Sequence, residues 1–204
     1  MKILIDGRSD ILSSDNGYSV GEILRQIEEF LLKIGRISLG ATLDGTPLMR
    51  DNSKVLEKLV DDYEVLEIKT GEIRRQAYNA LSEVKAHLPG IVQKVKNVSE
   101  RIQSGELVQG YKTLAGCADL MNGMVRVIEE VKTLAGVDLN ELELPGDSVT
   151  ERLKVVSEVL GRTKEALDAR DTVTVADMME YELAPNLERW NEILEGLLEK
   201  MGEC

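Results

Sequence analysis

The chain has 204 residues, of which 43% are hydrophobic and 30% charged, so it can bury the cores of one or two soluble domains. Its formal net charge of −12 argues against general binding to nucleic acid or to anionic membranes, because both need clustered Lys and Arg. Aromatic residues make up only 3%, which favours an aliphatic helical core over a β-sandwich.

The cysteine content and the apolar runs indicate the cellular compartment of the protein. Cys117 and Cys204 are its only two cysteines, too few for a disulfide framework. No apolar run approaches the roughly 18 residues that span a bilayer, and the first residues lack the long apolar stretch of a signal peptide. We therefore expect a protein of a prokaryotic cytoplasm, with no membrane segment.

The first 70 residues alternate short strand-like runs with one clear helix. A strand at residues 3–5 turns at Asp6-Gly7, and a second strand at residues 10–13 would complete a hairpin. Ser19 and Glu22 form a capping box that starts an amphipathic helix, which Gly35 ends. The apolar stripe of this helix consists of Val20, Ile23, Leu24, Ile27, Phe30, Leu31 and Ile34.

The next run alternates apolar and polar residues, which predicts a strand with one buried face. That face would carry Ile37, Leu39, Ala41 and Leu43. Asp44-Gly45 is a strong hairpin signal, and Pro47 limits the second arm to an edge strand. A short helix capped by Asn52 or Ser53 and a last strand at residues 63–69 complete this part.

The order of these elements resembles the β-grasp, or ubiquitin-like, arrangement. The resemblance is one of element order and size and covers about a third of the chain. The chain lacks the free di-glycine tail of conjugated ubiquitin-like proteins, because Thr70-Gly71 runs directly into a helical pattern. We therefore predict an α+β domain at residues 1–70 and no conjugation.

From residue 71 onward, apolar residues recur at alternating steps of three and four, which is typical of helices packed on helices. The first stripe stays in phase across Pro89-Gly90, so residues 72–104 form one kinked helix or two stacked halves. Further helices follow Gly105, the capping box of Ser148 and Glu151, and Asp171. Residues 71–204 thus predict an all-α antiparallel bundle of about four helices, similar to a coiled coil.

Two features of the bundle leave alternatives open. Gly116 and Gly123 lie seven residues apart, which favours close approach of two helix backbones over space for a ligand or for flexing. Trp190 lies on the apolar stripe of the last helix, so we expect it in the core, although tryptophan is also a common interface anchor.

The charges of the bundle are distributed unevenly. Residues 71–104 contain six basic and three acidic residues, whereas residues 171–204 contain two basic and nine acidic ones. The simpler interpretation is that the first and last helices lie side by side. The alternative is an acidic outer face that meets a basic partner.

No catalytic or cofactor signature is recognisable. The single histidine, His87, has no nucleophile nearby and is expected at the surface or its boundary. The sequence also lacks a phosphate-binding glycine loop and any Cys-x-x-Cys pair. The only candidate site is a carboxylate and tyrosine cluster on the last helix, made of Asp177, Glu180, Tyr181 and Glu182, where a hard cation could bind. A solvated acidic face explains this cluster more simply, so we predict no catalytic residue, cofactor or metal.

Two functions remain. The first is a non-catalytic protein–protein interaction role, as an adaptor, assembly factor or export chaperone with an unidentified protein partner, and the continuous heptads add an expected homodimer. The second is a bundle that binds a small molecule or metal, either as a binding protein or as an enzyme, through the cluster on the last helix.

Overall fold

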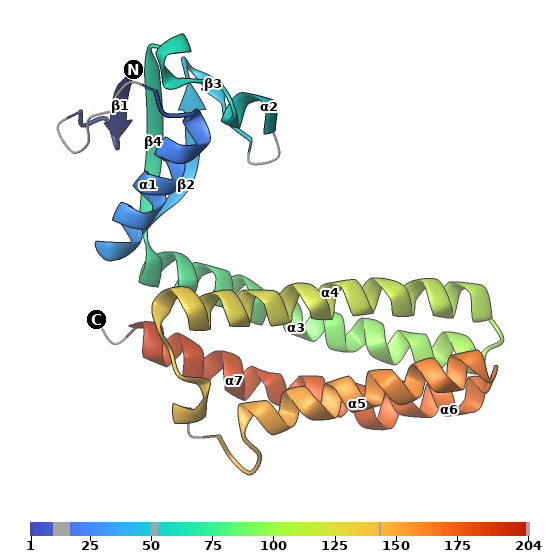
Figure 1. Ribbon diagram of the computed structural model, residues 1–204. Helices are drawn as coiled ribbons and strands as arrows, with labels where there is room; N and C mark the ends of the chain where they lie inside the picture. Colours follow the sequence, from blue (N-terminus) through green and yellow to red (C-terminus); the bar gives the residue numbers. More distant parts are fainter. Residues whose placement is uncertain (10–16, 50–52, 143, 203–204) are drawn as a thin grey trace. The chain divides into compact units, whose positions relative to one another are not determined.

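The computed structural model describes residues 1–9, 17–49, 53–142 and 144–202. The chain divides into two compact units, Met1–Gln76 and Ala77–Cys204. The described residues of the first unit hold a mixed sheet of four strands, and those of the second are helical (Figure 1). Each unit buries an apolar cluster of its own.

The sheet of the first unit has the strand order β1-β4-β2-β3. Its strands are β1 (Lys2–Ile5), β4 (Val65–Glu72), β2 (Arg36–Leu43) and β3 (Thr46–Pro47). β1 pairs with β4 in parallel, whereas β4 with β2 and β2 with β3 are antiparallel. The strand expected at residues 10–13 and the cap expected at Asn52 lie outside the described residues.

Helix α1 (Val20–Lys33) covers one face of this sheet. The predicted capping box is confirmed: Ser19 Oγ accepts from the Glu22 N–H at 3.2 Å, and the Glu22 carboxylate accepts from the Ser19 N–H at 2.8 Å. Val20, Ile23, Ile27 and Leu31 are buried against the sheet, but Ile34 is 52% exposed because it caps the helix rather than continuing it. Gly35 follows with a φ of 71°, as the helix end requires.

Strand β2 departs from the predicted alternation at one residue. Ser38 pairs with Thr70 and Gly40 with Lys69, which are neighbours in β4, so Leu39 is an extra residue in a bulge. Leu39 is 53% exposed, and the prediction that it shares a buried face with Ala41 and Leu43 is therefore wrong. The hairpin signal is confirmed, because Asp44 and Gly45 both have positive φ angles between the paired Leu43 and Thr46.

The remaining elements of the first unit are α2 (Ser53–Leu56) and a 3-10 turn at Val60–Asp62. Strand β4 runs to Glu72, past its predicted end at Lys69, and helix α3 begins at Ile73. Asp6, at the end of β1, accepts hydrogen bonds from the Thr70 N–H and hydroxyl and lies 3.2 Å from Arg36 Nη2. These contacts tie β1, β4 and β2 together at one end of the sheet.

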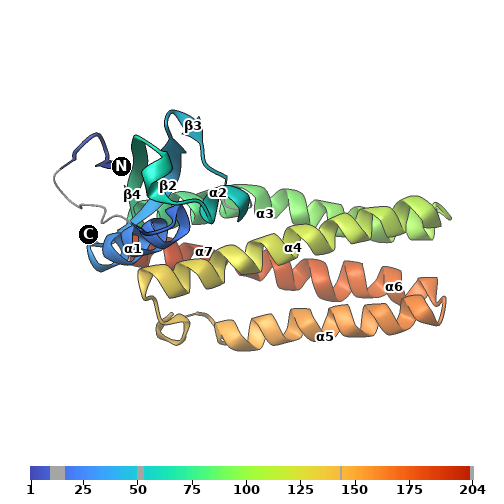
Figure 2. The ribbon, with the colours of Figure 1, turned by 45° about the horizontal axis from the view of Figure 1, so that its top comes forward.

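The second unit contains long helical segments that lie side by side in both views (Figures 1 and 2). They are α3 (Ile73–Gln103), α4 (Leu107–Ala135), α5 (Val149–Asp168) and a last segment built from α6 (Thr172–Asp177), a π-helical turn (Met178–Leu183) and α7 (Ala184–Gly202). Helix α3 is continuous through Pro89, which decides between the two alternatives for this segment. A 3-10 turn at Leu139–Glu141 lies between α4 and α5.

The core of this unit is aliphatic apart from Trp190, which is fully buried. Lys85 of α3 contacts Glu195 of α7 at 2.9 Å, and Lys96 contacts Glu188 at 2.8 Å. These ion pairs confirm that the basic first helix and the acidic last helix lie side by side.

The glycines of α4 behave differently from the prediction. A Cβ added at Gly116 or Gly123 would meet nothing within 4 Å, so no backbone approaches closely there. The tight contact lies at Gly110 instead, where an added Cβ would come within 2.9 Å of Ile102 Cγ1. Among the described helices, none combines the length and the apolar composition that crossing a membrane requires.

Candidate functional site

The candidate cluster on the last helix falls within the π-helical turn. The N–H of Ala184 donates to the carbonyl of Met179, five residues back, so the turn holds one residue more than an α-helix would. Pro185 follows at once. A proline cannot donate a backbone hydrogen bond, and its ring clashes with the carbonyl four residues earlier, which favours such a widened turn. Because of the wider turn, neighbouring side chains of the cluster point in different directions.

The two carboxylates of the turn contact different helices. Glu180 accepts from the Ser99 hydroxyl of α3 at 2.9 Å and from the Gln103 amide at 3.3 Å. Glu182 instead pairs with Arg162 of α5. Tyr181 is 67% exposed, and the Glu180 carboxylate beside it raises the pKa of the phenol above its ordinary value of 10.0. Asp177, also exposed, contributes less to that rise.

The arrangement gives these residues structural partners rather than a shared ligand site. In residues 1–9, 17–49, 53–142 and 144–202, no group of three or more His, Cys, Asp or Glu side chains is placed to hold a metal ion. His87 is exposed, and Cys117 is fully buried, where burial raises the pKa of its thiol. Cys204 lies outside the described residues.

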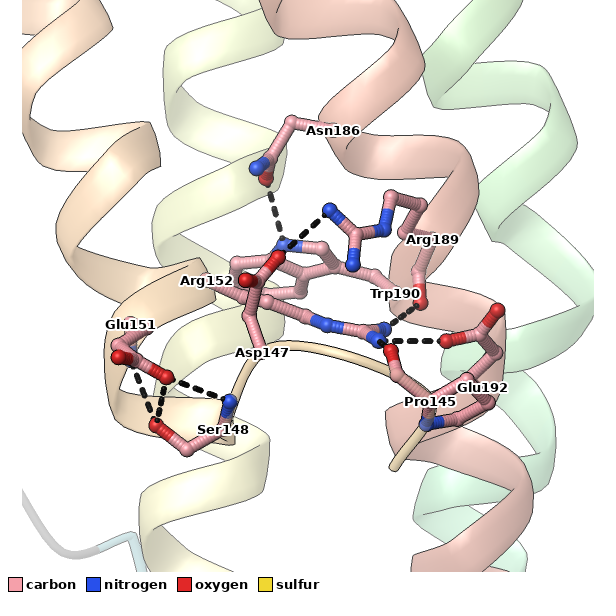
Figure 3. Close-up of polar contacts among 9 residues, drawn as sticks. All are labelled: Pro145, Asp147, Ser148, Glu151, Arg152, Asn186, Arg189, Trp190 and Glu192. Carbon is pink, nitrogen blue, oxygen red and sulfur yellow. Dashed lines mark hydrogen bonds and ion pairs between the residues drawn. The ribbon is translucent and has the colours of Figure 1, made fainter.

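A second polar cluster, which the sequence reasoning missed, is built around a buried arginine (Figure 3). Only 1% of Arg152 is exposed. Its Nη1 donates to the Arg189 carbonyl at 2.7 Å, and its Nη2 donates to the Pro145 carbonyl at 2.9 Å and lies 2.6 Å from the Glu192 carboxylate. The guanidinium therefore joins α5 and α7 to the loop that precedes α5.

Other polar contacts secure the same loop. Asp147 pairs with Arg189 at 2.8 Å, and Ser148 and Glu151 form the predicted capping box of α5. The Trp190 indole N–H donates to the Asn186 side chain at 3.1 Å, so the buried ring has its polar atom satisfied. Because its two Nη atoms donate to backbone carbonyls and form an ion pair with Glu192 in the same unit, we interpret the Arg152 cluster as a structural contact that holds the loop in place.

A signal for Arg152 was present in the sequence. It lies three residues after Val149 and four before Val156, both of which are buried, so it occupies a core-facing position of α5. A charged residue at such a position indicates a buried polar contact, since an unpaired charge would be strongly destabilising there.

A groove with a volume of about 680 Å³ lies between α1, β2 and β3 in the first unit. Its charged lining residues are Arg25 and Glu28, which belong to α1. The remaining lining residues are uncharged: Gly21, Leu24, Ser38, Leu39, Gly40, Ala41, Pro47, Leu48, Met49 and Leu56. Sequence reasoning did not find this groove, because it forms where the bulged β2 extends beyond the two-residue β3.

Two family models match the chain, one on each unit. The model described as Domain of unknown function (DUF8042) matches residues 79–193, and the one described as TP0873 N-terminal domain matches residues 1–72. An uncharacterised protein of Treponema pallidum (strain Nichols) is 24% identical over 189 residues, which cover 91% of this chain and 92% of that protein. No solved structure matches the chain.

Proposed function

The chain belongs to the family of the Domain of unknown function (DUF8042), whose model spans more than half of it, and we propose that it is a non-catalytic protein–protein interaction protein. It would act as an adaptor, assembly factor or export chaperone in a prokaryotic cytoplasm. The partner is another protein, and its binding requires neither a cofactor nor a metal.

The observation that carries this proposal is the groove between α1, β2 and β3. A concave, largely uncharged surface of about 680 Å³ is well suited to apolar side chains of a partner. Its rim exposes large apolar residues: Leu39 is 53% exposed and Met49 64%. Exposed apolar residues gathered around one hollow are a recognised mark of an interaction surface.

The test is affinity capture from the native cell with matched variants of the full-length chain. Wild type, a Leu39→Glu/Met49→Glu double variant and Leu32→Glu would be compared by quantitative mass spectrometry. Leu32 is a suitable control because it is 47% exposed on α1 and does not line the groove. We expect one protein to be enriched with wild type and Leu32→Glu and lost with the double variant. Equal capture by all three baits would contradict the proposal.

We further propose that the first unit is a β-grasp domain. The neighbouring order β1-β4-β2-β3, the parallel pairing of β1 with β4 and the single helix packed on one face all support this assignment. The fold also needs a second strand beside β1, for which residues 10–13 are our candidate. Backbone hydrogen bonds between those residues and β1, detected by NMR, would support the assignment, and a helix there would contradict it.

We also propose that the chain forms a homodimer through α4. This helix exposes Leu120 (40%) and Leu134 (41%). The exposed residues Lys112, Asp119 and Arg126 recur every seven positions with alternating charge, so they share one side of the helix. Two antiparallel copies of α4 would place Asp119 of each beside Arg126 of the other, which is the self-complementarity that a two-fold interface requires.

A further inference from the structure

The edge of β2 that faces away from β4 is only partly covered. β3 pairs with β2 at Thr42 and Leu43, and the Leu48 N–H donates to the Ala41 carbonyl at 2.9 Å. Over residues 36–40, β2 pairs with β4 on one side, and no described residue forms a strand on the other. An uncovered strand edge presents backbone N–H and C=O groups to which an extended chain can add.

A hollow lies on each face of the sheet near this edge; of residues 36–40, Ser38, Leu39 and Gly40 line the one on the α1 face, whereas Gly40 alone lines the other. The groove described above lies on the α1 face. A smaller hollow of about 220 Å³ is lined by Gly40, Ala41, Thr42, Pro47, Glu67 and Lys69. Leu66 and Ile68 are buried on the α1 side of β4, so Glu67 and Lys69, which alternate with them, lie on the opposite face. The two hollows meet at Gly40, Ala41 and Pro47.

We propose that an extended segment of another protein adds to the sheet along residues 36–40 of β2, end to end with β3. This inference rests on the proposed function and names the chemistry of its partner. Side chains of a strand point alternately to the two faces, and here the α1 face offers the larger groove along residues 38–40. Residues that enter the α1 groove are apolar, and those between them are polar or charged, because they lie on the sheet face that carries Glu67 and Lys69 on β4, beyond β2.

The length of the uncovered edge of β2 fits a short peptide segment. Five residues of β2 extend about 17 Å, so a partner segment of about five residues, with two or three apolar side chains on the groove side, matches the uncovered edge. Backbone hydrogen bonds would supply much of the affinity, and the groove would supply the preference for apolar residues at every second position.

The experiment selects a phage-displayed library of random 12-residue peptides against the full-length wild-type protein. The enriched peptides are then synthesised, and their binding to wild type, Leu39→Glu/Met49→Glu and Leu32→Glu is measured by calorimetry. We expect apolar residues at alternate positions, a loss of at least tenfold in affinity with the double variant and no loss with Leu32→Glu. On peptide binding, hydrogen exchange should slow at residues 37–41 of β2.

Three results would overturn this inference. They are the absence of any enriched peptide, enriched peptides without alternation, and slowed exchange confined to residues outside β2. Protection of β2 that grows with protein concentration in the absence of peptide would show instead that a second copy occupies the edge. If a cellular partner is captured through the groove but no strand-like peptide binds, the proposed function stands and this inference fails. If the double variant captures the partner as well as wild type does, both fail.

Discussion

At the scale of single residues, Arg152 is the side chain on which the helical unit depends most clearly. Its guanidinium meets two backbone carbonyls and the Glu192 carboxylate while only 1% of the residue is exposed. In the part of the chain that the structure describes, its Nε has no hydrogen-bond partner, so the contacts of its two Nη atoms must offset the burial of the charge. Removing it would leave the carbonyls of Pro145 and Arg189 without their donor.

We predict that Arg152→Ala lowers the free energy of unfolding of the helical unit by about 3 kcal/mol, because it removes a fully buried side chain and leaves the buried Glu192 Oε2 atom without its charge partner. The matched control is Arg162→Ala, which removes a surface ion pair with Glu182 and should change stability by at most about 1 kcal/mol. Urea unfolding followed by the fluorescence of Trp190, the only tryptophan, measures both. Equal effects of the two substitutions would contradict the role of Arg152.

The glycines of α4 give a second prediction at this scale. Gly116→Ala and Gly123→Ala should each stabilise the helix by about 1 kcal/mol, because a Cβ meets open space there and alanine favours helix. Gly110→Ala should destabilise it, since the Cβ would come within 2.9 Å of Ile102 Cγ1. Urea unfolding followed by Trp190 fluorescence measures the free energy of unfolding of the three variants. A stabilising effect at Gly110 would show that Ile102 moves aside without loss.

These residues also show which single positions the sequence could predict. Ser19 and Ser148 can be recognised as helix caps from the sequence because a cap depends on partners within three residues. The carbonyl partners of Arg152 include one 37 residues away, at Arg189, so its role needed the tertiary structure. Spacing alone likewise could not distinguish Gly110, which contacts another helix, from Gly116 and Gly123, which do not.

At the scale of elements, the π-helical turn explains how α6 and α7 keep one buried side through Pro185. Met179 and Leu183 are both fully buried, and the turn between them takes up one additional residue. Tyr181, which is 67% exposed, lies within this turn and away from the core. The turn is therefore equivalent to a single-residue insertion into an otherwise regular helix.

We predict that deleting Tyr181 together with Pro185→Ala converts the turn into regular α-helix and keeps the unit folded. Met179 and Leu183 would then be three residues apart and remain on one face. The proline is replaced because in a regular helix it would clash with the preceding turn.

The control for this deletion removes Glu188 instead, again with Pro185→Ala. That deletion rotates every following residue by about 100° and turns Trp190 out of the core. Thermal unfolding followed by circular dichroism should show a cooperative transition for the first variant and a much weaker one for the second. Similar melting curves for the two deletion variants would show that the π-helical turn is not equivalent to a single-residue insertion.

The elements differ in how far the sequence predicted them. The helices of the second unit follow from long three-and-four periodicity, and the turn at Asp44-Gly45 follows from its own residues. The bulge at Leu39 and the π-helical turn were missed for a common reason. One extra residue in a strand or helix changes the local direction of side chains but leaves an apolar pattern that still resembles a regular element. The groove at β2 depends on that bulge and on the shortness of β3, so it could not be predicted either.

At the scale of the whole molecule, the charged residues of the bundle are of two kinds. Some form ion pairs between its helices, and others are exposed to solvent. The acidic residues of α7 at Glu188 and Glu195 are paired with lysines of α3 within the same unit. On α4, by contrast, Lys112, Asp119 and Arg126 lie exposed with alternating sign. Within this series, Asp119 and Arg126 complement each other when two copies of α4 run antiparallel with Asp119 opposite Arg126, which favours a second copy of the same helix as the partner.

Self-association can therefore be tested by exchanging the charges of α4. We predict that light scattering after size-exclusion chromatography gives about twice the chain mass of 22.6 kDa for wild type. Asp119→Arg should shift the protein toward the monomer, because it sets like charges opposite each other between the two copies. The double variant Asp119→Arg/Arg126→Asp should restore the dimer, since it exchanges the two charges and re-establishes opposite signs. A wild-type mass of 22.6 kDa at high concentration, or a double variant that stays as dissociated as the single one, would contradict pairing through α4.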